Sequence, residues 1–227
     1  MGQRLARMGP NLVDQLASMW PPTLDAAFLA SLGEPLLATV HIATLGTLLA
    51  LGAAIPLAFL AARTTSPFAI VRLVALLVLV TSRSVNSLVW ALLFVLVLGP
   101  GTLAGILAIA VRSVGFCGKL LYEAIEEVDP SPIEAIRATG ASSAQTWVYA
   151  IVPQVLPALI SLSVFRWEIN VRESTVIGLV GAGGLGLVLK GALDHGAWRD
   201  IASLILLMLI LVAVCEALAA AIRARTV

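Results

Sequence analysis

The stretch of residues 35–62 contains no Asp, Glu, Lys or Arg, and this feature restricts the chain more than any other. A helix rises about 1.5 Å per residue and the hydrocarbon layer of a bilayer is about 30 Å thick, so this stretch is long enough to cross a membrane. Only 12% of the 227 residues are charged, whereas soluble domains are about one quarter charged. The sequence therefore predicts an all-α integral membrane protein.

About five transmembrane helices are predicted. The apolar runs that could span the bilayer cover residues 35–62, 68–98, 102–122, 145–165 and 201–222. The second run is over-long and is interrupted by polar residues near Arg83, and the turn at residues 99–101 separates it from the third run. A polar stretch at residues 123–143 connects the third and fourth runs.

Positive charges predict the orientation, because Lys and Arg favour the cytoplasmic side of a membrane. Arg63 follows the first run, Arg137 follows the third with Lys119 nearby, and Arg223 and Arg225 follow the fifth. The N-terminus then lies outside, although Arg4 and Arg7 disfavour this. We expect residues 1–31 to be an interfacial or extracytoplasmic segment or the remnant of a first span, and residues 32–227 to form the transmembrane domain.

Several other functions are not supported by the sequence. A net charge of +1 gives no indication of nucleic-acid binding, and Cys117, Cys215, His41 and His195 lack partners at metal-ligand spacing. Residues 115–120 imitate a phosphate-binding loop but have the wrong glycine spacing. Residues 181–186 match a dinucleotide fingerprint but precede a membrane span, so a tight turn for close helix packing is the better interpretation.

A short helix is predicted in the polar stretch, at residues 129–140. We expect Ser131 to cap its start with Glu134 reaching back, Pro132 to occupy the first turn, and Gly140 to end it in the left-handed conformation. Helices below about 12 residues are marginal alone in water, so this helix needs a packing surface. That surface is either the chain's own membrane domain or a partner protein.

Ionisable residues within the apolar runs form two groups. Arg83 and Asn86 lie near the middle of the second run, either at an interface or lining a pathway. In the second group, helical spacing places Arg166, Asn170 and Glu173 on one face and Glu168 with Arg172 on another. We expect this group to close the fourth span, as a structural ion-pair network or as a gate that contacts an anion.

The residues Glu134-Ala135-Ile136, Gly140 and Val152-Pro153 together resemble the cytoplasmic signature of binding-protein-dependent ABC importer permeases. Ile136 and Ala150 depart from the usual residues of that signature. The resemblance implies a type I ABC importer permease (MetI-like) architecture whose coupling region, residues 124–145, docks on an ATPase. The docking residues would be Ser131, Ile133, Glu134, Ala135, Ile136, Arg137, Gly140 and Pro153.

Further blocks, at residues 89–94, 118–126, 170–173 and 181–186, look like those of phosphonate-type permeases. This resemblance covers residues 35–222 and implies a bacterial inner-membrane homodimer without a cofactor of its own. Two partner ATPases would bind ATP and Mg, and an extracytoplasmic binding protein would deliver a phosphonate or related oxyanion. The expected pathway or gate residues are Arg83, Asn86, Arg166, Glu168, Asn170, Arg172, Glu173, Gly181, Gly183 and Gly184.

Asn86 stands near an expected proline, and the N-terminal region is shorter than the family's leading span. These departures leave open the import of methionine or another small solute by the same architecture. A membrane-embedded enzyme would need a convergent acid–base or metal constellation, which the sequence does not show. A non-transporting scaffold would explain the docking helix but not the intramembrane arginines.

Overall fold

The computed structural model describes residues 17–226, with side chains up to residue 224, and the regular elements within this part are all helical. The elements in chain order are α2 (Ala26–Ser31), α3 (Gly33–Ala61), α4 (Ala69–Ser84), α5 (Ser87–Leu98), α6 (Thr102–Glu126), α7 (Pro130–Ala138), α8 (Ser143–Thr146), the π-helix η1 (Trp147–Ile151), α9 (Val152–Ile177), the 3-10 helix η2 (Gly178–Val180), α10 (Gly184–His195) and α11 (Trp198–Thr226).

The prediction of about five spans is confirmed. Four stretches in residues 17–226 are long and apolar enough to cross a membrane, and they contain α3, α6, α9 and α11. The pair α4 and α5 is a fifth candidate, bent by 91°. The bend lies at residues 85–86, where the side chain of Asn86 accepts a hydrogen bond from Leu88 N and caps α5. The predicted interruption near Arg83 is therefore present.

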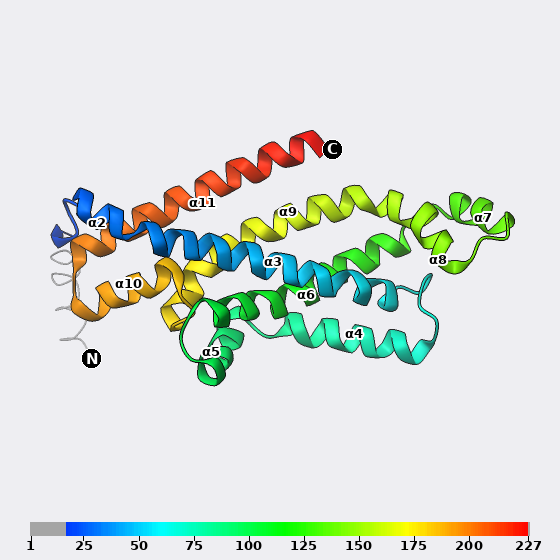
Figure 1. Ribbon diagram of the computed structural model, residues 1–227, viewed down its shortest axis with the longest axis horizontal. Helices are drawn as coiled ribbons and strands as arrows, with labels where there is room; N and C mark the ends of the chain where they lie inside the picture. Colours follow the sequence, from blue (N-terminus) through cyan, green and yellow to red (C-terminus); the bar gives the residue numbers. More distant parts are fainter. Residues whose placement is uncertain (1–16, 227) are drawn as a thin grey trace, which may run out of the picture.

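The helices form an elongated bundle with two different ends (Figure 1). The short helices α7 and α8 project beyond one end, while α2, α10 and the start of α11 lie at the other. Towards its C-terminus, α11 diverges from the rest of the bundle (Figure 1). The predicted docking helix thus lies at the opposite end of the long axis from α2, α10 and the start of α11.

Close packing of small residues holds the spans together, since in a bilayer helix contact depends on van der Waals fit. The most extensive contact joins α3 to α6. A Cβ on Gly46 would lie 2.7 Å from Ile109 Cγ2, and one on Gly115 of α6 would collide with the carbonyl oxygen of Leu79 in α4. Even an alanine would push these helices apart.

Two predicted boundaries are wrong. The fourth span was expected to end near Phe165, but α9 continues to Ile177, because the charged side chains between residues 166 and 173 find partners on other helices or on α9 itself. The fifth run was expected to start at residue 201, but α11 starts at Trp198, so Arg199 and Asp200 belong to its first turn. An acid there is favoured by the positive end of the helix dipole.

The glycine run after α9 forms the predicted tight turn. Gly181, Gly183 and Gly184 have φ angles of 94°, 83° and 70°, a region that favours glycine. The turn docks onto two other elements: Leu185 N donates to Thr39 Oγ1 at 2.8 Å, and Gly101 N donates to Gly181 O at 2.9 Å. The turn therefore fixes the end of α9 against the starts of α3 and α6.

Candidate functional site

The predicted short helix is present as α7, which we call the coupling helix. Its cap is Asp129 rather than Ser131: the Asp129 carboxylate accepts hydrogen bonds from Ser131 N at 2.9 Å and from Ser131 Oγ at 2.8 Å. The prediction for Ser131 is wrong because Pro130 already occupies the first turn, so the helix starts earlier. These two bonds, the backbone one first, lower the pKa of Asp129 below its ordinary value.

The two faces of the coupling helix have different surroundings. Ile133 is buried, and it packs against a cluster that includes Ala58, Ile125 and Ile151 of the bundle. On the other face, Glu134, Ala135 and Arg137 are exposed. The helix is thus attached to its own domain through Ile133 and leaves a surface open for another protein.

An open hollow lies beside the exposed face of the coupling helix. Its volume is about 470 Å³, and it is lined by Ile136, Thr139, Gly140, Ala141, Gln145 and Tyr149. Gly140 ends the coupling helix with a φ of 82°, as predicted, and its Cα faces open space. Pro153 lies apart from this hollow, exposed in the first turn of α9.

Side-chain hydrogen bonds tie the start of the coupling helix to α9. Asp129 N donates to Gln154 Oε1 at 3.0 Å, and Gln154 Nε2 donates to Ala150 O at 2.8 Å. The π-helical turn η1 precedes this point, and its residues Ala150 and Ile151 are buried beside Ile133. A displacement of the coupling helix would therefore be transmitted directly to the cytoplasmic end of α9.

A second group of functional candidates lies farther along α9. Arg166 and Glu173 approach each other at 3.6 Å between Nη2 and Oε2, and Arg112 of α6 forms an ion pair with the same carboxylate. The Arg166 side chain is only 3% exposed. We call Arg112, Ser113, Arg166, Asn170 and Glu173 the charged layer.

Hydrogen bonds within the charged layer run in one direction across the bundle. Arg166 Nε donates to Ser113 Oγ at 2.9 Å, and Ser113 Oγ donates to Asn170 Oδ1 at 3.1 Å. Asn170 Nδ2 then donates to Thr47 Oγ1 of α3 at 2.8 Å, and Thr47 donates to Ala43 O at 2.6 Å. The guanidinium of Arg166 also lies over the Phe116 ring, 5.0 Å from its centroid. Arg166 is therefore held firmly without any help from Glu173.

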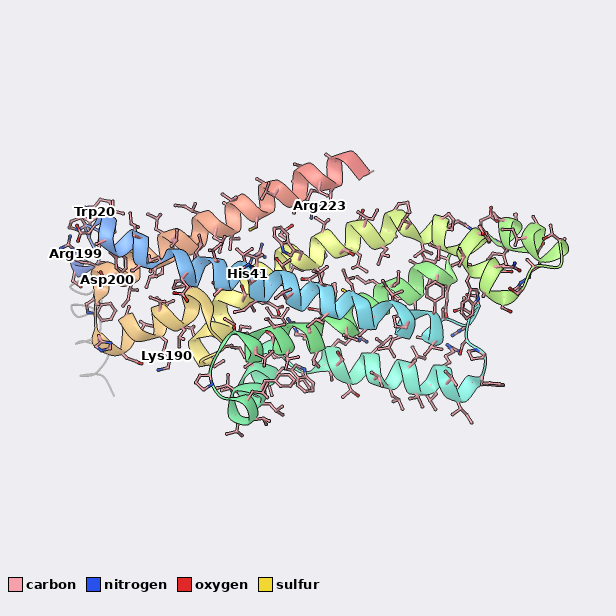
Figure 2. The ribbon with its side chains drawn as sticks, in the orientation of Figure 1. Trp20, His41, Lys190, Arg199, Asp200 and Arg223 are labelled. Atoms are coloured by element: carbon pink, nitrogen blue, oxygen red, sulfur yellow. The ribbon has the colours of Figure 1, made fainter. Side chains whose placement is uncertain are left out.

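Glu168 faces the other side of α9, as the helical spacing predicts. It lies 3.6 Å from Arg172 Nη2 and accepts a hydrogen bond from Arg223 Nη1 of α11 at 3.1 Å. Figure 2 shows Arg223 near the C-terminal end of α11, on the side that faces α9. This bond links the end of α11 to the bundle from which it otherwise diverges.

Arg83 and Asn86 are not part of the charged layer. Both side chains are exposed on the surface of the single chain, at the bend between α4 and α5. The neighbouring Ser82 is buried, bonded to the carbonyl oxygen of Val111 and accepting from Gly115 N at 3.1 Å. An exposed arginine within an apolar span calls for a covering surface other than lipid.

Arg112, Ser113 and Thr47 are not among the site residues predicted from the sequence. Arg112 could have been found by the criterion that selected Arg83, since it is an ionisable residue inside an apolar run. Ser113 and Thr47 carry no such signal, because single hydroxyl residues are common in spanning helices and usually bond to their own backbone.

At the end of the bundle opposite α7, Figure 2 shows Trp20, Arg199 and Asp200 close together. Arg199 Nε donates to Pro21 O at 2.7 Å, and Ser203 Oγ donates to Thr23 O at 2.7 Å. These bonds hold the chain before α2 against the start of α11. Residues 1–16 of the predicted N-terminal segment lie outside the described residues.

In the part of the chain from 17 to 226, no group of three His, Cys, Asp or Glu side chains could hold a metal ion. Cys117 and Cys215 are both buried free thiols. The polar groups that the structure does bring together are arginines, hydroxyls, amides and carboxylates inside a helical bundle, which suits the passage or exclusion of ions.

Relatives of known name match nearly the whole chain. It is 43% identical over 213 residues to "Phosphate-import permease protein PhnE" of Mycolicibacterium smegmatis, a match that covers 94% of this chain and 40% of that protein. It is 38% identical over 214 residues to "Phosphite transport system permease protein PtxC" of Stutzerimonas stutzeri, covering 94% of this chain and 77% of that protein. The chain thus spans less than half of the first of these relatives.

A solved structure of similar fold is a chain of the MetNI methionine ABC transporter in an inward-facing conformation. The two share a TM-score of 0.75 and 23% identity, over 90% of this chain and 100% of that one. This likeness confirms the type I permease architecture. The model of the family "Binding-protein-dependent transport system inner membrane component" matches residues 54–226. The chain therefore belongs to the inner-membrane components of binding-protein-dependent transport systems, as a multi-pass permease subunit.

Proposed function

We propose that this chain is the channel subunit of an ATP-driven importer for a phosphonate or a related phosphorus oxyanion. The observation that carries the proposal is the identity of 43% and 38% to permeases named for phosphate and phosphite, each over 94% of the chain. The charged layer supports it, because two arginines share one carboxylate and leave one positive charge in excess. Such a site attracts an anion.

In this proposal the energy comes from separate ATPase subunits that bind ATP and Mg and dock on the coupling helix. The exposed residues Glu134, Ala135 and Arg137, the adjacent hollow and Gly140 form the docking surface. Ile133 and Ile136 pack against the bundle behind this surface, and Ser131 and Pro153 are exposed beside it. Movement of the ATPases would then reach the charged layer through α9, which is continuous from Val152 to Ile177.

The importer would contain two copies of this chain and receive its substrate from an extracytoplasmic binding protein. Arg83 and Asn86 support a second copy, because these exposed polar side chains would be covered at an interface or line a shared pathway. Arg166, Glu168, Asn170, Arg172 and Glu173 would border that pathway. The turn at Gly181, Gly183 and Gly184 would set the position of its outer end.

Gentle affinity purification of the tagged chain from its native membranes tests the partners. An ATPase subunit and a binding protein are expected to copurify, and the Glu134→Arg variant should lose the ATPase while still inserting. The recovered binding protein is then titrated with methylphosphonate, phosphite, phosphate and methionine. Recovery of the chain alone would overturn the assignment of the coupling helix.

Methionine import is the rival within the same fold. Its support is a 32% identity to "Methionine import system permease protein MetP" of Bacillus subtilis that covers only 40% of this chain. A binding protein that takes methionine and no phosphorus oxyanion would favour this rival. Recovery of the chain with unrelated membrane proteins and no transport phenotype would favour a scaffold.

A further inference from the structure

The carboxylate of Glu173 occupies a position between two arginines from different helices. Arg112 of α6 pairs with its Oε1 atom, and Arg166 Nη2 of α9 lies 3.6 Å from its Oε2 atom. Arginine forks bind carboxylates and phosphorus oxyanions through the same geometry of N–H donors. A carboxylate held in this way occupies a position that a transported oxyanion could also take.

The contact between Arg166 and Glu173 is incomplete. Within residues 17–226, Arg166 Nη2 and Glu173 Oε2 are both buried and neither forms a hydrogen bond. A buried polar group without a hydrogen bond is costly, more so when it is charged. The guanidinium of Arg166 therefore retains a donor that an anion with one more oxygen atom could satisfy.

The two partners differ in how firmly they are held. Arg166 keeps its place through the Phe116 ring and through Ser113, which itself donates to the Asn170 amide, and none of these contacts involves Glu173. Glu173 is held by its two arginines, and no other side-chain hydrogen bond to its carboxylate is found within residues 17–226. The carboxylate can leave without disturbing the guanidinium.

The position is open on one side. The Arg112 and Glu173 side chains are 28% and 17% exposed, whereas Arg166 is 3% exposed. The exposed side of the position is therefore the side of Arg112, and Arg166 lies at its buried end.

We propose that Arg112 and Arg166 form a binding site for the transported oxyanion and that the Glu173 carboxylate occupies this site between turnovers. The inference rests on the proposed function. When the oxyanion arrives, it displaces Glu173 and takes the donors of both arginines. When the oxyanion leaves, Glu173 returns. Competition from the resident carboxylate weakens binding, as release requires, and offsets one of the two positive charges while no oxyanion is bound.

The test measures anion affinity in the purified membrane complex, this chain with its ATPase subunits, in lipid nanodiscs. Methylphosphonate is titrated while its phosphorus resonance reports the bound fraction, and sulfate serves as the second tetrahedral anion. If the carboxylate occupies the site about nine-tenths of the time, its removal raises the apparent affinity about tenfold. Glu173→Gln should therefore bind methylphosphonate about tenfold more tightly than the wild type.

Two matched variants accompany Glu173→Gln. Glu123→Gln removes a carboxylate that pairs with Lys119 on the surface of α6 and should leave the affinity unchanged. Arg166→Gln combined with Glu173→Gln should abolish the gain. If Glu173→Gln fails to assemble, Glu173→Asp, whose shorter side chain reaches the arginines less well, should bind more tightly than wild type by about threefold.

An unchanged or weaker affinity in an assembled Glu173 variant would overturn the proposal. Uptake of methylphosphonate by the wild-type importer with its binding protein is measured in parallel. If the wild type takes up methylphosphonate but the Glu173 variant binds it no more tightly than the wild type, the proposal of a resident carboxylate is overturned and the proposed function stands. No uptake of any phosphorus oxyanion overturns the proposed function, while a tighter affinity of the variant for sulfate would still support the anion site.

Discussion

The coupling helix and the charged layer are attached to the same helix, α9, but they are stabilised in opposite ways. Ile133 is the buried residue of α7. The start and the end of this helix are fixed by Asp129 and Gly140, which flank it in the sequence. In the charged layer, Arg166 and Asn170 are buried and their partners come from α3 and α6. The ends of the coupling helix are therefore set by local residues and a single buried side chain anchors it, whereas the charged layer is held by the packing of three spans.

This difference assigns different consequences to damage in the two regions. A change in the coupling helix should leave the membrane domain folded and affect the transfer of motion, because little of the domain depends on it. A change in the charged layer should affect folding first, because it leaves charges or hydrogen-bonding groups unpaired in a medium without water. Four variants or conditions test this division, in order of decreasing expected effect.

Replacing Arg166 should have the largest effect. Arg166→Met leaves Glu173 with one arginine and deprives Ser113 of its donor, and breaking a buried ion pair costs about 3 kcal/mol. Unfolding of the chain in mixed detergent micelles measures the loss. The control is Arg172→Met, because the Arg172 side chain is 54% exposed and such pairs contribute at most about 1 kcal/mol. Equal losses for the two variants would contradict the division.

Replacing Asn170 should have the next largest effect. Asn170→Leu keeps the number and branching of the side-chain heavy atoms but removes the acceptor for Ser113 and the donor to Thr47, which costs about 1 to 3 kcal/mol. The same unfolding assay applies. Ser163→Ala on the same helix is the control, since Ser163 donates to the carbonyl of Leu159, one turn earlier on its own helix. Its effect should stay within about 0.5 kcal/mol.

Gly140→Val should affect coupling more than folding. A side chain at a φ of 82° is strained by about 1 to 2 kcal/mol, and this strain falls on the end of the coupling helix alone. The ratio of substrate uptake to ATP hydrolysis should drop about tenfold, the factor that corresponds to about 1.4 kcal/mol. Gly191→Ala, at a helical glycine in open space, is the control. Normal uptake by Gly140→Val would contradict the coupling role.

The smallest effect is expected from pH at the start of the coupling helix. Because hydrogen bonds from Ser131 lower the pKa of Asp129 in the folded chain, the charged carboxylate stabilises the cap. This stabilisation is fully present above the ordinary Asp pKa of about 3.9, and it is lost as the pH falls through the lower folded value. Amide hydrogen exchange at Ser131, corrected for the intrinsic rate, should therefore accelerate on acidification. Asp129→Asn, whose cap does not titrate, should show no such change.

The fold could be predicted from the sequence to a large extent, because apolar runs and glycine or proline breaks are local signals. The coupling helix was predicted for the same reason, and the error over its cap arose because Asp129 and Ser131 are both good caps and each precedes a proline. The bend between α4 and α5 was also visible as polar residues within an apolar run.

The charged layer could be predicted only in part. Spacing along α9 placed Arg166 with Glu173 and Glu168 with Arg172, since these pairs share a helix. The partners of Arg166 and Asn170 on other helices, Ser113 and Thr47, are 53 and 123 residues away in the chain, and no local pattern indicates them. The end of the fourth span was predicted wrongly for the same reason. Charged residues can remain within a spanning helix when they have partners, and the sequence does not indicate the partners on other helices.

The most direct test of the proposed function is substrate uptake by the complete importer, reconstituted in vesicles with its ATPase subunits and binding protein. The vesicles carry the ATPase subunits on their inner side and are loaded with ATP. Labelled methylphosphonate, phosphite, phosphate or methionine is then added outside, together with the binding protein. We predict ATP-dependent accumulation of at least one phosphorus oxyanion and none of methionine. Accumulation of methionine without any phosphorus oxyanion would contradict the account.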